Sequence, residues 1–340
     1  MSRERFRSME EFAQASGISR PTLSKYFDDP ASVRETTRHR IEAALKRFDY
    51  RPNLFARNLN RKQTRAIGII VPHITDPFYA ELVRQMELRC VAAGFWPIVI
   101  SSHGAADLEA RAVETLMSLK VAGALVAPLG SQTDAEALES LRGDIPMVFF
   151  DSRLDGSAPF VGTDNRQSMT LVAEYLCRTG EHPAFLEMPA VNGNAAERKA
   201  AYVEALERFG LAPILIGADE TTWNFEELGF RTVQRLLQGP GLQTRCLLCA
   251  NDRMAFGAMA AAYQHRLRVG RGSDSDLRIA GHDDHPLSRY ACPPLTTAAQ
   301  DTVAIAERST ELLLALLQDP TTHSGEELRL PARLVMRDSA

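Results

Sequence analysis

Polar and aromatic side chains follow many of the apolar runs in the second part of this 340-residue sequence. Carboxylate, amide and guanidinium groups can hydrogen-bond neighbouring hydroxyl groups in pairs, and aromatic faces cover the C–H face of a sugar ring. Residue types of this kind predict a site for a polyhydroxylated small molecule. The set consists of Asp76, Phe78, Tyr79, Asp151, Asn194, Arg198, Trp223, Asn251 and Asp283.

The elements that must position these residues alternate between short apolar runs and helical patterns. Near-continuous apolar strands separated by helices indicate parallel sheets covered on both faces. The repeats are too numerous for one compact sheet, so we expect two doubly wound lobes around a cleft, with the ligand beyond the carboxyl ends of the strands. The expected strands are 66–71, 97–100, 122–127, 147–150, 184–188, 213–216, 246–250 and 278–281, with helices at 78–93, 107–119, 134–142, 166–179, 195–209, 226–238 and 253–265.

Several of these residues also have a purely structural interpretation. Asp76 could cap the helix that follows it, because a carboxylate accepts hydrogen bonds from the free N–H groups of a helix start. Phe78 and Tyr79 could belong to the core. Arg198 and Asp283 could pair with each other as a structural bridge. These alternatives remain open at the level of the sequence.

Two short patterns could suggest metal or redox chemistry. Cys246 and Cys249 have CxxC spacing, but they lie in an apolar run that is typical of a buried strand, where residues three apart point to opposite faces. His282 and His285 follow a strand without a second pair of ligands nearby. Asp252 is interpreted as a helix cap. We therefore expect no metal and no cofactor.

No nucleophile elbow, phosphate-binding loop or dinucleotide glycine motif is present in the sequence. A glycoside-processing enzyme would need two carboxylates around one bond, and Asp151 and Asp283 can be offered for that role. Arg198 beside them fits binding better than proton transfer. One candidate function is thus that of a cytoplasmic sugar-binding or sugar-processing protein with a fused helical domain.

A second group of residues with potential function lies near the N-terminus. Ser8 and Glu11 form a capping box, Gly17 ends that helix, and Ser19 caps a second helix. Two short helices around a tight turn, with basic and hydroxyl side chains outside the second, fit a helix-turn-helix whose second helix enters the major groove. The alternative is an ordinary small helical bundle. The outward side chains are Arg20, Thr22, Ser24 and Lys25.

The charge distribution favours the DNA-binding interpretation. Residues 1–65 carry 15 Lys and Arg against 8 Asp and Glu, whereas residues 66–340 carry 24 against 35. A basic head on an acidic body is the pattern expected of a phosphate-binding module.

Short motifs recur along the whole chain: 9–27 (MEEFAQASGISRPTLSKYF), 33–38 (VRETTR), 50–53 (YRPN), 56–59 (ARNL), 76–79 (DPFY), 198–202 (RKAAY), 250–255 (ANDRMA), 281–284 (GHDD) and 293–297 (PPLTT). Together these segments resemble the lactose-repressor (LacI/GalR) family of bacterial transcription regulators. Three positions depart from the family pattern: Ala201 replaces a glycine, His282 replaces an aromatic residue, and Thr302 stands where several sugar-binding members have an aromatic residue.

The resemblance implies an α/β protein with an N-terminal three-helix helix-turn-helix head, a hinge helix and a two-lobed body like that of periplasmic binding proteins. The body, built of doubly wound parallel sheets, would bind the effector and dimerise. The implied segments are 1–52 for the DNA-binding domain, 53–65 for the hinge helix and linker, 66–163 and 292–322 for lobe one, and 164–291 and 323–340 for lobe two.

The resemblance also implies roles in the cleft. Arg198 and Asp283 would be the main effector clamps. Phe78, Tyr79 and Trp223 would stack on the ligand, while Asp151, Asn194 and Gln300 would add hydrogen bonds. The expected effector is a sugar or sugar alcohol, with a purine as second choice.

On the DNA side, the resemblance places Arg20, Pro21 and Lys25 at base-facing positions, and Pro21 can make only apolar contact there. Thr22, Ser24 and Asn53 would contact phosphate. Leu59, flanked by Arg57, would act as a minor-groove wedge, although it could instead pack on the body.

The partners expected are a pseudopalindromic double-stranded operator, a small-molecule effector and a second copy of the chain. A single short recognition helix reads few bases, which favours a dimer, and no leucine heptads follow the last strand to add a tetramer module. Neither an apolar run of 18 residues nor an apolar N-terminal signal is present, so we expect a cytoplasmic protein without a membrane span.

Overall fold

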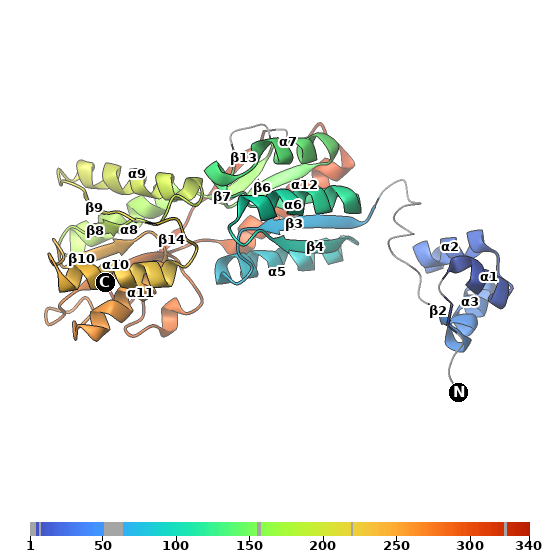
Figure 1. The fold of residues 1–340 in the computed structure, drawn as a ribbon, viewed down its shortest axis with the longest axis horizontal. Helices are drawn as coiled ribbons and strands as arrows, with labels where there is room; N and C mark the ends of the chain where they lie inside the picture. Colours follow the sequence, from blue (N-terminus) through green and yellow to red (C-terminus); the bar gives the residue numbers. More distant parts are fainter. Residues whose placement is uncertain (1–4, 7, 51–63, 155–157, 219, 323–324) are drawn as a thin grey trace. The chain divides into compact units, whose positions relative to one another are not determined.

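The computed structural model describes residues 5–6, 8–50, 64–154, 158–218, 220–322 and 325–340. The chain divides into two compact units, Met1–Thr64 and Arg65–Ala340. Figure 1 shows the two units, coloured along the sequence. Among the described residues, no helix is both long enough and apolar enough to cross a membrane.

The first unit is a three-helix head. Ser8 and Glu11 form the expected capping box, and Gly17 ends α1 in the left-handed conformation with φ of 66°. Phe12, Leu23 and Ile41 come from different helices and are fully buried together. Its elements are β1 (Arg5–Phe6), α1 (Met9–Ser16), α2 (Arg20–Asp28), η1 (Pro30–Ser32), α3 (Glu35–Arg47) and β2 (Asp49–Tyr50).

Lobe one of the second unit is a six-stranded parallel sheet in the order β13-β7-β6-β5-β3-β4. Side chains alternate along β3, so Ile67 and Ile69 pack under α5 and α12 while Ile70 packs under α6 and α7. The strands are β3 (Ala66–Val71), β4 (Trp96–Ser101), β5 (Gly123–Val126), β6 (Met147–Phe150), β7 (Phe160–Thr163) and β13 (Glu327–Leu330); the helices are α5 (Pro77–Ala92), α6 (Ala106–Leu119), η2 (Gly130–Gln132), α7 (Ala135–Asp144) and α12 (Thr302–Gln318).

Lobe two is a second six-stranded sheet in the order β14-β12-β11-β10-β8-β9, with only β14 antiparallel to its neighbour. Helices α8 and α9 pair with each other, as do α10 and α11. The strands are β8 (Ala184–Leu186), β9 (Ile214–Ile216), β10 (Cys246–Cys249), β11 (Arg278–Asp283), β12 (Thr296–Ala299) and β14 (Arg333–Val335); the helices are α8 (Asn165–Thr179), α9 (Gly193–Arg208), α10 (Phe225–Gln238), α11 (Asp252–Gln264) and η3 (Ser288–Tyr290).

The chain crosses between the lobes at three places, and two of them differ from the boundaries expected from the sequence. The first crossing joins β7 to α8, as expected. The segment 292–322 was expected in lobe one, but β12 pairs with β11 in lobe two, so the crossing falls between β12 and α12. The segment 323–340 was expected in lobe two, but β13 pairs with β7 in lobe one before β14 returns to lobe two. The small buried side chains of β12 suit the interior of a sheet, whereas the alternating charges of β13 suit an edge.

Candidate functional site

A cavity of about 40 Å³ lies where the strand ends of the two lobes face each other. All ten residues expected at an effector site line it, so the structure brings the whole predicted set together. These are Asp76, Phe78, Tyr79, Asp151, Asn194, Arg198, Trp223, Asn251, Asp283 and Gln300. The lining also includes Met188, Asn192, Phe225 and Arg253, which the sequence reasoning missed.

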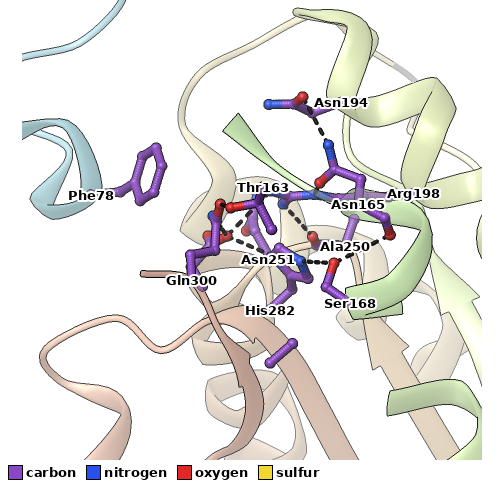
Figure 2. Close-up of polar contacts among 12 residues, drawn as sticks. Phe78, Thr163, Asn165, Ser168, Asn194, Arg198, Ala250, Asn251, His282 and Gln300 are labelled. Atoms are coloured by element: carbon purple, nitrogen blue, oxygen red, sulfur yellow. Dashed lines mark hydrogen bonds and ion pairs between the residues drawn. The ribbon is translucent and has the colours of Figure 1, made fainter. Parts of the chain in front are cut away.

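Arg198 is a deeply buried cation of the cavity. It extends from α9, is 4% exposed, and lies with Nη2 3.4 Å from Asp283 Oδ1. Its Nε donates to Asn165 Oδ1 at 2.9 Å and its Nη1 donates to the Ala250 carbonyl at 2.8 Å, contacts that Figure 2 shows. The structural bridge between Arg198 and Asp283, left open as an alternative by the sequence, is therefore present, and both residues also line the cavity.

Asp283 closes β11 on a backbone with φ of 123°, a conformation that L side chains rarely adopt. Its Oδ1 accepts from His282 Nδ1 and from Gln300 Nε2, each at 2.8 Å. Burial favours the protonated acid, but Arg198 and the donors His282 and Gln300 outweigh it and keep the pKa of Asp283 below its usual range. The clamp carboxylate is thus ionised at neutral pH.

A second carboxylate, Asp151, follows β6 and links the lobes. Its Oδ2 accepts from the Tyr79 hydroxyl at 2.6 Å, and its Oδ1 accepts from Asn194 Nδ2 of lobe two at 3.1 Å. Burial raises the pKa of Asp151 to about 6. Tyr79 is 3% exposed and belongs to the core of lobe one, and it also lines the cavity.

Asp76 both caps a helix and joins the lobes. Its Oδ1 accepts from the Phe78 backbone N–H at 3.0 Å at the start of α5, as the capping interpretation expected. Its Oδ2 pairs with Arg253 Nη1 at 2.9 Å. Arg253 comes from the first turn of α11, donates to both oxygens of Glu226, and lies over the Phe225 ring at 5.1 Å.

Aromatic rings from both lobes surround the same cavity. Trp223 belongs to lobe two, and its ring centroid lies 6.1 Å from that of His73 and 6.4 Å from that of Tyr79 in lobe one. Gly104, with φ of 72°, packs so closely against the indole that a Cβ there would clash with it. Phe78 faces the polar cluster from the side of lobe one in Figure 2.

Arg253 and Phe225 were missed because they open helices α11 and α10 rather than close strands. The sequence did contain a sign that Arg253 belongs to the site, because Arg253 directly follows Asn251 and Asp252 at the end of a strand. Within the described part of the chain, no group of three His, Cys, Asp or Glu side chains is placed to hold a metal ion.

The head presents its own set of predicted residues on α2. Arg20, Pro21, Ser24 and Lys25 are exposed, Thr22 is half-buried, and Leu23 between them is fully buried. The Ser19 side chain caps α2 by accepting from the Thr22 N–H. Arg20 Nε also pairs with the exposed Glu10 at 2.9 Å. The hinge positions Asn53, Arg57 and Leu59 lie outside the described residues.

Comparisons with known proteins cover both units. Residues 8–53 match the model of "Bacterial regulatory proteins, lacI family", and residues 178–340 match that of a "Periplasmic binding protein-like domain". The ribose operon repressor of Escherichia coli (strain K12) is 30% identical over 336 residues, covering 98% of this chain and 99% of the relative. The transcriptional repressor CytR of the same strain is 30% identical over 343 residues, covering 98% and 96%.

Solved structures give the same result. The lac repressor dimer bound to operator and an anti-inducer has a TM-score of 0.83 at 28% identity, with 98% of each chain covered. A LacI family regulator from Enterococcus faecium with bound ribose has a TM-score of 0.69 at 26% identity, covering 81% of this chain and 98% of that one. These matches confirm the resemblance and the fold expected from the sequence motifs. The chain therefore belongs to the lacI family of bacterial regulatory proteins.

Proposed function

We propose that this protein is a transcriptional repressor whose affinity for operator DNA is controlled by a neutral sugar bound in the cleft between the lobes. The observation that carries the proposal is the convergence of all ten predicted residues on one interlobe cavity. The relatives named above include repressors of sugar operons, and one related structure holds ribose.

The charges of the cavity favour an uncharged effector. Its two guanidinium groups, Arg198 and Arg253, already face carboxylates at 3.4 and 2.9 Å. A phosphate or carboxylate on the ligand would therefore have to displace a carboxylate from its cation. Hydroxyl groups instead donate to carboxylates and accept from guanidinium groups without breaking these pairs. Neutral sugars and sugar alcohols should thus bind, and sugar phosphates should not.

The sugar would act by fixing the relative position of the lobes. Contacts that join lobe one to lobe two include Asp76 with Arg253, Asp151 with Asn194, Thr163 with Gln300, and Arg329 with Glu197 at 3.0 Å. A ligand changes a conformational equilibrium by binding one arrangement more tightly than another. A sugar that contacts both lobes would favour one lobe angle. Through residues 53–65, this angle would change how two heads pair on the operator.

The proposal includes a homodimer that binds a pseudopalindromic operator. In lobe one, Leu88 and Val91 on α5 are 58% and 52% exposed, and Trp96 at the start of the edge strand β4 is 71% exposed. In lobe two, the tip of α11 carries the exposed Tyr263. Figure 1 shows α5 and α11 along the same side of the body, which suits one continuous interface between two copies.

A thermal-shift panel of neutral sugars, sugar alcohols, sugar phosphates and purines tests the effector class. A ligand at 100 times its dissociation constant should stabilise the protein by about 2.7 kcal/mol. The shift should disappear in Arg198→Ala and remain in the control Arg166→Ala, which removes an exposed arginine of the same lobe that pairs with Glu204. A shift caused only by purines or sugar phosphates would contradict a neutral sugar.

The sugar-processing alternative makes a different prediction for the same protein. The relatives are repressors rather than enzymes, which supports a binding role. Prolonged incubation with the stabilising sugar should return it chemically unchanged. Conversion of the sugar that depends on Asp151 or Asp283 would favour the enzyme instead.

A further inference from the structure

His282 is fully buried, and its ring bridges Asp283 and Ser168. Nδ1 lies 2.8 Å from Asp283 Oδ1, and Nε2 lies 2.8 Å from Ser168 Oγ, as Figure 2 shows for the Ser168 contact. Burial, aided by the nearby Arg198 charge, lowers the pKa of His282 to about 4, so the ring is neutral at pH 7.

The neighbours of His282 determine which ring nitrogen carries its single proton. The ionised Asp283 can only accept a hydrogen bond, so the proton lies on Nδ1. Nε2 then accepts, and the Ser168 hydroxyl donates to it. The Asn165 carbonyl, 3.2 Å from Ser168 Oγ, is the longer of the two contacts available to that hydroxyl. The result is a directional chain from Ser168 through His282 to Asp283.

This chain leaves one carboxylate oxygen of Asp283 free for a ligand. Oδ1 receives His282 Nδ1 and Gln300 Nε2 at 2.8 Å and faces Arg198 Nη2 at 3.4 Å. Within the described ranges, no protein group hydrogen-bonds Oδ2. The backbone of Asp283 is also strained, with φ of 123°, and a strained conformation persists only where surrounding contacts hold the residue in place.

The first turn of α8 supports both charged groups of the clamp. Asn165 and Ser168 lie one helical turn apart, and both are at most 2% exposed. Asn165 Oδ1 accepts from Arg198 Nε, while its Nδ2 donates to Asn194 Oδ1 at 3.0 Å. Ser168 reaches Asp283 through His282. One helical turn therefore connects to the guanidinium on one side and to the carboxylate on the other.

We propose that Asn165, Ser168 and His282 are positioning residues for the Arg198–Asp283 clamp. Asn165 orients the guanidinium, and Ser168 acts through His282 to hold Asp283 so that Oδ2 is presented to a hydroxyl group of the ligand. The inference deepens the proposed function and rests on it for the identity of the ligand. The sequence pointed to His282 as a replacement for an aromatic residue and as part of a His282–His285 pattern, and not as a positioning residue.

The order Ser–His–Asp also occurs in hydrolases, but the geometry here excludes that role. Ser168 is 0% exposed and faces inward from α8. A nucleophile must be within reach of a substrate carbonyl. Ser168 Oγ is buried away from the cavity lining, so the three residues orient a carboxylate and do not attack a bond.

The first test needs no ligand. Two-bond ¹H–¹⁵N spectra of the full-length protein report which nitrogen of each imidazole is protonated, and comparison with His282→Asn assigns the His282 ring. We expect a proton on Nδ1 and a bare Nε2, with Ser168→Ala shifting the Nε2 resonance. A His282 ring protonated on Nε2 would contradict the proposed series of hydrogen bonds from Ser168 through His282 to Asp283.

The second test measures the affinity of the neutral sugar that stabilises the wild type, beginning with ribose. His282→Phe restores the aromatic residue expected from the motif but removes the donor to Asp283, so affinity should fall about ten-fold or more. His282→Asn should stay within about three-fold of wild type, because an amide N–H can replace Nδ1–H. The control Tyr202→Phe removes a buried hydroxyl that donates to the Pro183 carbonyl in the same lobe, and should leave affinity unchanged.

The outcomes separate this inference from the proposed function. Wild-type affinity in His282→Phe, or equal losses in the Phe and Asn variants, would show that packing rather than hydrogen bonding matters and would overturn the inference. If no sugar binds the wild type, the proposed function fails, and the ring spectrum alone decides the positioning chain.

Discussion

Arg253 of lobe two pairs with Asp76 of lobe one across the cleft, with 2.9 Å between Nη1 and Oδ2. Glu226 holds the same guanidinium from within lobe two. Asp76 in turn caps α5, so the pair connects the start of one helix in each lobe. The contact therefore links lobe closure to the cavity, since both residues line it.

Breaking this pair should destabilise the body. Burial already raises the pKa of Asp76 even with Arg253 beside it, so Arg253→Met leaves a buried carboxylate without its cation. We expect a loss of about 3 kcal/mol in the free energy of unfolding, measured by urea denaturation. Adding Asp76→Asn should recover part of the loss, because the amide can still cap α5. Strict additivity of the two substitutions would contradict coupling between the residues.

Asp151 should make stability depend on pH in a defined direction. Burial raises its pKa to about 6, above the ordinary value of 3.8, so the unfolded chain loses this proton at lower pH than the folded protein does. Protonated Asp151 therefore contributes to the free energy of unfolding below pH 4, and this contribution is lost as pH rises towards 6.

The comparison with Asp151→Asn isolates this effect. We compare the free energies of unfolding of the wild type and the variant. The wild-type value minus the variant value should fall by about 3 kcal/mol between pH 4 and pH 7. Denaturant unfolding at several pH values measures it. A difference that stays constant over this interval would show that Asp151 titrates normally.

The proposed dimer face can be tested by introducing charge. Val91→Glu places a carboxylate among the exposed apolar side chains of α5, so the dimer should dissociate at concentrations where the wild type remains dimeric. Analytical ultracentrifugation provides the measurement. Leu215→Glu, at a 41% exposed position on the edge strand β9, is the matched control and should remain dimeric. A dimeric Val91→Glu protein would place the interface elsewhere.

Two lysines of the head should differ in what they contribute to DNA binding. Lys25 is exposed on α2, and Lys25→Ala should cost about 1–3 kcal/mol of specific affinity and relax discrimination between operator variants. Lys46 is exposed near the end of α3, and Lys46→Ala should weaken all duplexes alike if it contacts phosphate. Binding assays on a small operator library separate the two. Unchanged discrimination in Lys25→Ala would argue against base contact.

The predicted set of cavity residues converges because of a general property of parallel sheets. Asp76, Asp151, Asn251 and Asp283 each follow a strand or close one, and the carboxyl ends of parallel strands meet at one edge. The apolar runs of the sequence mark these strand ends, so they locate Asp76 and Asp151 at the carboxyl edge of one sheet and Asn251 and Asp283 at that of the other.

Residues that act from helices were harder to predict. Arg253, Asn165 and Ser168 lie in first turns of helices, where polar residues are common for capping reasons alone. Their roles depend on side chains distant in sequence, such as Asp76 and His282. The lobe boundaries near β12 and β13 were also misplaced, because strand pairing across a crossover is not encoded in local periodicity.

The central claim is that a sugar in the cleft controls operator binding. Its most direct test is the affinity for operator DNA, measured at fixed salt with and without the stabilising sugar, for the wild type and for Arg198→Ala. We predict that the sugar changes operator affinity of the wild type several-fold and leaves that of the variant unchanged. An operator affinity that does not respond to the sugar in the wild type, or responds equally in Arg198→Ala, would contradict the account.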